Sequence, residues 1–151
     1  MALRTRYVHT NLIAHDWRKL AAFYIQVMGC IPVLPERDLS GDWLERSTGV
    51  RGAAIQGIHL RLPGHGDHGP TLEVFQYNVA AHGSEPVPNR PGFAHIAFSV
   101  DDLQAACVAV LGAGGRAVGE IVSTGIPGVG TISFAYVTDP EGNIIELQHW
   151  D

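Results

Sequence analysis

The sequence contains an internal repeat, and a repeat constrains the fold of a chain of this length more than any other feature. Residues 9–16 can be written over residues 95–102, with a histidine first and an aspartate last in each. Residues 71–77 likewise match residues 144–150, with a glutamate third in an apolar, strand-like run. Each half therefore carries one His followed by one Glu. The two pairs are His9 with Glu73 and His95 with Glu146.

The repeat lies within one domain. A chain of 151 residues is long enough for a single domain with a substantial core, so we expect one domain over residues 1–151. Its first module is predicted over residues 5–79, a proline-bearing linker over 80–92, and its second module over 93–150. The His-to-Glu separation is longer in the first half, which predicts an insertion, placed here at residues 38–51.

Each half is predicted to contain a strand, a helix and three further strands. Asp16 is expected to cap the first helix, and Asp101 or Asp102 the second. We expect a helical turn at residues 43–46 and a Gly/Pro-rich loop at about 122–130. The predicted strands are 7–14, 31–36, 53–62 and 71–77 in the first half and 93–100, 116–122, 131–137 and 144–150 in the second, with helices at 17–28 and 102–111.

Alternation along the strands predicts where the four side chains point. Around His95 the apolar residues occupy alternate positions and suit packing on a helix, which leaves His95 on the opposite face. The same pattern places Glu146 opposite its apolar neighbours. The first half repeats this arrangement for His9 and Glu73. All four side chains are thus expected on the face away from the helices, which is the inner face if both halves share one curved sheet.

Two imidazoles and two carboxylates form a nitrogen and oxygen ligand set. Such a set suits Ni, Co, Zn, Mn or Fe(II) and contains too little oxygen for Ca. Four protein ligands on a six-coordinate ion leave two positions for neighbouring substrate oxygens, whose polarisation stabilises an enediolate or enolate. A ligand carboxylate, Glu146 before Glu73, is then expected to move the proton. The alternative is a set of relic ligand positions in a protein that binds its ligand without metal.

Other polar residues on the same faces are candidates for substrate binding. His59 and Arg61 share a strand face and are expected to contact an anionic substrate if that face is the inner one. Three more lie two or four residues from a predicted ligand on the same face, namely Asn11, Tyr77 and Gln148. The alternative for all five is that they are ordinary polar or packing residues of strands. Tyr136 and Phe134 are interpreted as wall, and His65 and His68 as solvated loop residues.

Composition excludes several classes of function. The net charge of −5 leaves no basic stripe, which argues against nucleic acid and anionic membranes as partners. No apolar run approaches the length of a membrane span, and the first residues lack the apolar segment of a signal peptide. Cys30 and Cys107 have no disulfide or metal-binding spacing and are interpreted as buried small hydrophobes. We therefore expect a cytoplasmic protein with a small-molecule substrate, acting as a homodimer.

These residues resemble those of the vicinal oxygen chelate superfamily. That superfamily includes glyoxalase I, methylmalonyl-CoA epimerase, extradiol dioxygenases, and fosfomycin- and bleomycin-resistance proteins. The resemblance covers nearly the whole chain and rests on four segments: His9 to Asp16, Leu72 to Phe75, Gly92 to Asp101 and Asp139 to Leu147. It implies an α+β fold in which two βαβββ modules form a curved mixed sheet with a concave metal-binding cup. It also places His9, Glu73, His95 and Glu146 at the family's metal-ligand positions.

The ligand set is most similar to those of glyoxalase I and methylmalonyl-CoA epimerase. It predicts a metal-dependent lyase or isomerase. The alternatives are a non-catalytic small-molecule binding or resistance protein and, disfavoured by Glu at the second ligand position, an Fe(II) extradiol-type dioxygenase. The chain departs from bacterial glyoxalase I at two positions associated there with glutathione. Ile13 stands in place of an Arg, and Tyr77 in place of an Asn, although Asn78 is adjacent.

Overall fold

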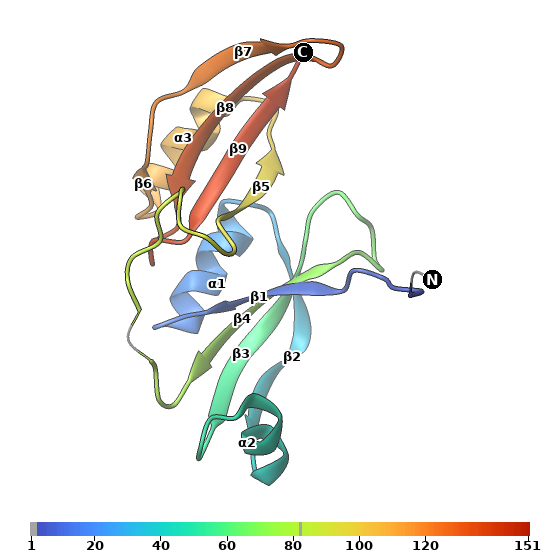
Figure 1. Ribbon diagram of the computed structural model, residues 1–151, viewed down its shortest axis with the longest axis vertical. Coiled ribbons are helices and arrows are strands. Elements are labelled where there is room, and N and C mark those ends of the chain that lie inside the picture. Colours follow the sequence, from blue (N-terminus) through green and yellow to red (C-terminus); the bar gives the residue numbers. More distant parts are fainter. Residues whose placement is uncertain (1–2, 82) are drawn as a thin grey trace. The chain divides into compact units, whose positions relative to one another are not determined.

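The computed structural model describes residues 3–81 and 83–151, and the chain divides into two compact units, Met1–His82 and Gly83–Asp151 (Figure 1). Each unit contains its own mixed β-sheet, with two helices described in the first unit and one in the second. The boundary falls inside the segment 80–92 that the sequence marks as a linker. The α+β class is confirmed.

The first unit is a four-stranded sheet with the strand order β1-β4-β3-β2. β1 runs parallel to β4, and the other neighbours are antiparallel. The parallel pair is joined through the rest of the unit, as a crossover connection requires. Its elements are β1 (His9–Ile13), α1 (Trp17–Gln26), β2 (Ile31–Ser40), α2 (Asp42–Thr48), β3 (Ala54–Arg61) and β4 (Thr71–Tyr77).

The second unit repeats this topology. β5 runs parallel to β9, which pairs with β8, and both β6 and β7 pair with β8 on its other side. β6 and β7 together take the place of β2, which itself has a register shift between Val33 and Arg37. Each unit is therefore a βαβββ module. The elements are β5 (His95–Ser99), α3 (Leu103–Gly112), β6 (Arg116–Ala117), β7 (Val122–Ile126), β8 (Gly130–Thr138) and β9 (Ile144–Trp150).

The two longer helices begin at aspartate caps. The Asp16 side chain accepts a hydrogen bond from the Lys19 backbone N at 3.1 Å. In the second unit Asp102, rather than Asp101, caps the helix and accepts from the Ala105 backbone N at 2.9 Å. These bonds satisfy backbone donors that a helix start leaves without intrahelical partners.

Each unit buries the apolar stripe of its helix against one face of its sheet. α1 packs on β3 and β4, and α3 packs on β8 and β9. The even-numbered residues of β4 face α1, which leaves the face with Glu73 turned away from that helix, as alternation predicts. The fully buried core side chains include Leu20, Tyr24, Leu60, Leu72 and Val74 in the first unit and Val110, Val137, Ile145 and Leu147 in the second.

The extra length of the first half is divided between two connections. The β2–β3 connection, residues 41–53, carries α2, whereas residues 127–129 alone join β7 to β8. The β3–β4 connection, residues 62–70, is also longer than residues 139–143 between β8 and β9. Placing the whole insertion at residues 38–51 was therefore wrong, because part of the extra length lies in the β3–β4 connection.

The segment 122–130 was also wrongly expected to be a loop. Residues 122–126 form β7, and the turn is confined to the residues before Gly130, where the Val129 N donates to the Ile126 O at 3.0 Å. Gly128 has a φ of +77° in this turn, a conformation that glycine adopts without steric cost. All five residues of β7 are exposed, so neither face carries the apolar alternation that signals a strand.

None of the helices in residues 3–81 and 83–151 is long and apolar enough to cross a membrane.

Candidate functional site

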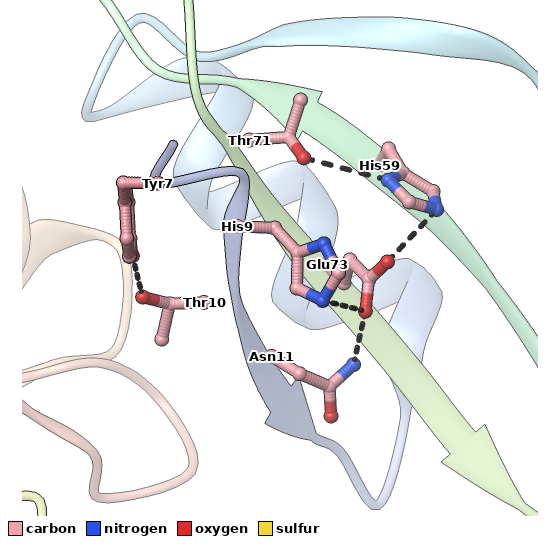
Figure 2. A network of polar contacts seen from close by, with 7 residues as sticks. All are labelled: Tyr7, His9, Thr10, Asn11, His59, Thr71 and Glu73. Carbon is pink, nitrogen blue, oxygen red and sulfur yellow. Dashed lines mark hydrogen bonds and ion pairs between the residues drawn. The ribbon is translucent and has the colours of Figure 1, made fainter. Parts of the chain in front are cut away.

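Glu73 lies at the centre of a polar network in the first unit (Figure 2). Its strand, β4, runs between β1 and β3, and the register places Asn11 and His59 beside it. Its side chain is 11% exposed. His9 Nε2 lies 3.4 Å from Glu73 Oε2, and Asn11 Nδ2 donates to the same oxygen at 3.1 Å. His59 Nε2 lies 3.1 Å from the other oxygen, Oε1.

His59 is held on several sides. Its Nδ1 lies 3.4 Å from the Thr71 hydroxyl, and its ring centre lies 5.6 Å from that of Phe75. Burial lowers the pKa of His59, and Arg37 lowers it further, against the opposite effect of Glu73. A lowered pKa leaves the imidazole neutral at pH 7. A neutral ring that donates from Nε2 to Glu73 has Nδ1 free to accept from Thr71.

Glu146 occupies the equivalent place in the second unit. It lies on β9 between β5 and β8, where the register places Ala97 and Tyr136 beside it. His95 Nε2 lies 3.0 Å from Glu146 Oε2. Tyr136 is the register partner of Glu146, and burial, followed by the charge of Glu146, raises the pKa of Tyr136. The Tyr136 ring centre lies 5.1 Å from that of His95.

The spacing within each His–Glu pair suits two neighbouring ligands of one ion. Two atoms that each lie about 2.1 Å from a metal are about 3.0 Å apart at a right angle and about 3.4 Å apart at the tetrahedral angle. The observed separations are 3.0 Å in the second unit and 3.4 Å in the first. Each half thus offers one imidazole nitrogen and one carboxylate oxygen, which suit the transition metals expected from the sequence.

His59 does not extend the first pair to three ligands. His9 and His59 contact different oxygens of Glu73, and their ring centres lie 6.2 Å apart. Within residues 3–81 and 83–151, no three His, Cys, Asp or Glu side chains form a group arranged to hold a metal. What the described residues offer is one pair of donor atoms in each unit.

Arg61 bonds to the long β3–β4 connection. Its Nη1 donates to the Asp67 carboxylate at 2.6 Å and to the Asp67 carbonyl at 3.2 Å. Its Nε is buried and has no hydrogen-bond partner in the described part of the chain. Arg6, which precedes β1, donates to the His68 carbonyl of the same connection at 2.7 Å. These two arginines hold the loop next to the strand that carries His59.

Tyr77 and Gln148 have other contacts. Tyr77 packs against a cluster beneath α2 that includes Ile55 and Phe75. This cluster lies on the same face of the sheet as Glu73. Ile55 is an even number of residues from His59 on β3, and Phe75 is two residues from Glu73 on β4, so all four side chains share that face. Gln148 accepts a hydrogen bond from Trp150 Nε1 at 3.2 Å.

Asn78, next to Tyr77, bonds to the backbone of the β2–β3 connection. Its side chain accepts from the Ala54 N at 2.9 Å and donates to the Gly52 O at 3.0 Å. Its amide is therefore used to close the connection that follows α2.

Two relationships were missed from sequence. Tyr136 was interpreted as part of the site wall, yet it is the register partner of Glu146, whose charge contributes to the raised pKa of Tyr136. His59 was assigned to a substrate, yet it contacts Glu73 directly. The repeat contained the signal, because His59 and Tyr136 occupy the same register position opposite the two glutamates. That position becomes visible only when the antiparallel strands are paired.

A family model matches most of the chain. Residues 6–147 match the model described as the Glyoxalase/Bleomycin resistance protein/Dioxygenase superfamily. A probable lactoylglutathione lyase of Vibrio parahaemolyticus is 31% identical over 144 residues, which cover 94% of this chain and 88% of that protein. A protein of the same name from Vibrio cholerae is 30% identical over 148 residues, with the same coverage of both chains.

Solved structures share the fold. A glyoxalase family protein from Bacillus cereus superposes with a TM-score of 0.75 at 20% identity, over 99% of this chain and 95% of that chain. A glyoxylase/bleomycin resistance protein/dioxygenase domain from Frankia superposes with a TM-score of 0.59 at 17% identity, over 100% of both chains. At these identities the likeness concerns the fold alone.

Proposed function

This chain belongs to the glyoxalase/bleomycin resistance protein/dioxygenase superfamily, and on that premise we propose that it is a metal-dependent lyase or isomerase. Its substrate is a small molecule with two neighbouring oxygens. The observation that carries the proposal is the His–Glu pair repeated in each unit, with ligand-like spacing of 3.4 and 3.0 Å. The names of the two Vibrio relatives favour a lyase.

The proposed ligands are His9, Glu73, His95 and Glu146, which would hold one divalent ion of Ni, Co, Zn, Mn or Fe. When bound, the ion supplies Lewis-acid polarisation of the substrate oxygens. The chain's own carboxylates supply the acid–base chemistry. Glu146 removes a proton from the carbon beside the polarised oxygen and returns it to the neighbouring carbon, so that the substrate is isomerised without net loss of a proton.

The substrate is proposed to be a 2-oxoaldehyde–thiol adduct. The relatives are named for lactoylglutathione, which makes the adduct of methylglyoxal and glutathione the first candidate. Ile13, half exposed at the end of β1, offers no charge to a glutathione carboxylate. Arg61, which shares the strand face of His59 and whose side chain is 23% exposed, is the proposed contact for an anionic part of the substrate. Adducts of other thiols and acyl-CoA epimers are therefore part of the same screen.

Elemental analysis of protein purified without a His-tag tests the proposal. The wild type is expected to contain about one transition-metal ion per chain, and His9→Ala and Glu146→Ala, one variant from each unit, are expected to lose it. His68→Ala, in the exposed loop, is the control and should retain the ion.

The opposite result favours a binding protein. If the wild type takes up no metal after incubation with Ni, Co, Mn, Fe(II) and Zn, the chelation mechanism fails. A non-catalytic small-molecule binder of the same fold then becomes the better assignment. Oxygen uptake with a catechol would instead support the dioxygenase alternative.

A further inference from the structure

The two glutamates of the repeat are held differently. Glu73 contacts three side chains that can donate to it, those of His9, Asn11 and His59. Glu146 contacts His95 and has Tyr136 as its register partner on β8. The two carboxylates occupy equivalent positions in the repeat but have different surroundings.

Glu146 lacks a counterpart of the Asn11 contact because a different residue occupies the corresponding position in the second unit. Asn11 pairs with Glu73 across the parallel β1–β4 ladder, and Ala97 pairs with Glu146 across the β5–β9 ladder. The two positions correspond in the repeat, yet alanine has no side-chain donor. Apart from the histidine of its own pair, the first glutamate has a polar register partner on each adjacent strand, whereas the second has one on β8 alone.

His59 and Asn11 act on opposite oxygens of Glu73. His59 contacts Oε1, whereas Asn11 and His9 contact Oε2 (Figure 2). Contacts at both oxygens restrict rotation of the Glu73 carboxylate about its terminal torsion. Hydrogen bonds to a charged acceptor are also stronger than neutral ones. Glu73 is thus fixed with Oε2 beside the His9 nitrogen.

We propose that His59 is a positioning residue that, together with Asn11, fixes Glu73 as a permanent ligand and thereby leaves Glu146 as the carboxylate that moves the proton. This inference rests on the proposed function. Residues that orient ligands change metal affinity by about 10- to 100-fold when they are removed. A carboxylate with fewer donors retains the freedom to leave its position and a lone pair to accept a proton.

Co(II) titration followed by visible absorption tests the role of His59. His59→Leu keeps an apolar volume without a donor and is expected to weaken Co(II) binding at least about tenfold. His59→Gln restores a donor toward Glu73 and is expected to recover most of that loss. Tyr136→Phe, the equivalent change in the second unit, is the matched variant and should change Co(II) affinity less than His59→Leu.

Exchange of the unequal position tests the role of Glu146. Ala97→Asn adds the donor that the second unit lacks and is expected to strengthen Co(II) binding several-fold while it slows turnover of the methylglyoxal–glutathione adduct. Ala97→Leu, which adds volume without a donor, should not strengthen Co(II) binding. Tighter Co(II) binding together with slower turnover is a split that a purely structural role would not produce.

The possible failures are distinguishable. A wild type that binds no Co(II) overturns the proposed function. A wild type that binds Co(II), with unchanged affinity in His59→Leu, overturns only this inference. Because His59→Leu can fail to fold, a long-range 1H–15N spectrum of the metal-free wild type provides a second measurement. The proton is expected on His59 Nε2, and a proton on Nδ1 alone would overturn the inference.

Discussion

At the scale of single residues, Gly57 shows how packing supports the candidate site. It pairs with Phe75 across the β3–β4 ladder. A Cβ at Gly57 would lie 2.3 Å from the Phe75 ring and 2.1 Å from the Val74 carbonyl oxygen. The absence of a side chain therefore lets the Phe75 ring lie over the strand, where it contacts His59 edge-on.

Gly57→Ala is expected to destabilise the fold by about 1–3 kcal/mol, because the added methyl group overpacks the strand against backbone. Urea unfolding monitored by circular dichroism measures the loss. Gly125→Ala in β7 is the matched control, since its Cβ would meet nothing within 4 Å. Equal effects of the two substitutions would contradict this account of Gly57.

Cys30 is a second residue whose chemistry follows from its surroundings. It is buried, and desolvation raises its pKa to about 11. Burial also raises the pKa of Cys107. The thiolate is the reactive form, so both thiols of the folded protein should react slowly with a disulfide reagent at pH 8. In protein unfolded in guanidinium, both thiols should react rapidly with the same reagent. Fast modification of Cys30 in the folded protein would contradict the prediction.

At the scale of secondary structure elements, an aspartate cap stabilises the start of each of the two longer helices. Asp102→Ala removes the side chain that accepts from the Ala105 N. The expected cost is about 1 kcal/mol in the free energy of unfolding. Asp101→Ala, one residue earlier, removes the same charge but no cap and is expected to cost less. A larger effect at Asp101 would show that charge, not capping, stabilises this helix start.

β9 is joined to the end of β5 by a titratable residue. His149 Nδ1 lies 2.9 Å from the Val100 carbonyl oxygen, and its Nε2 lies 3.4 Å from the Asp151 carboxylate. The Val100 bond is the main cause of a raised pKa at His149, and Asp151 adds to it. A pKa raised above its unfolded value of about 6.5 means that the stabilisation is present below that pH. It is lost as the pH rises through the folded value.

His149→Gln is therefore expected to lower the free energy of unfolding more at pH 5.5 than at pH 8.5. Urea titrations of wild type and variant at the two pH values provide the comparison. His65→Gln in the exposed loop serves as the control for removal of a histidine. A larger loss at pH 8.5 would reverse the predicted sign.

At the scale of the whole molecule, the two units each provide half of the proposed ligand set. An ion that binds the folded chain but not the unfolded chain raises the free energy of unfolding by about 2.7 kcal/mol when the free ion concentration is 100 times the Kd. Thermal unfolding with and without Co(II) measures this gain. His9→Ala and His95→Ala should each abolish it, although they lie in different units. If one of the two variants retained the full gain, a site built from both halves would be excluded.

Much of the fold was predictable because it depends on local pattern. The repeat, the aspartate caps and the alternation around His95 are properties of short segments, and they predicted two βαβββ modules. β7 was not predictable, because an exposed edge strand has no buried face to impose alternation. The division of the insertion was hidden for a related reason, since β2 continues into residues 38–40 by pairing with β3.

The sequence by itself determined which four side chains occupy matching positions in the two halves, and it predicted that each faces away from its helix, because strand alternation has a period of two. Tertiary structure alone decided which residues meet each glutamate. His59 and Tyr136 reach Glu73 and Glu146 through the register of antiparallel strands, which depends on how separate segments pair. The difference between Asn11 and Ala97 also depends on strand pairing, because it affects hydrogen bonding only where each residue lies beside a glutamate.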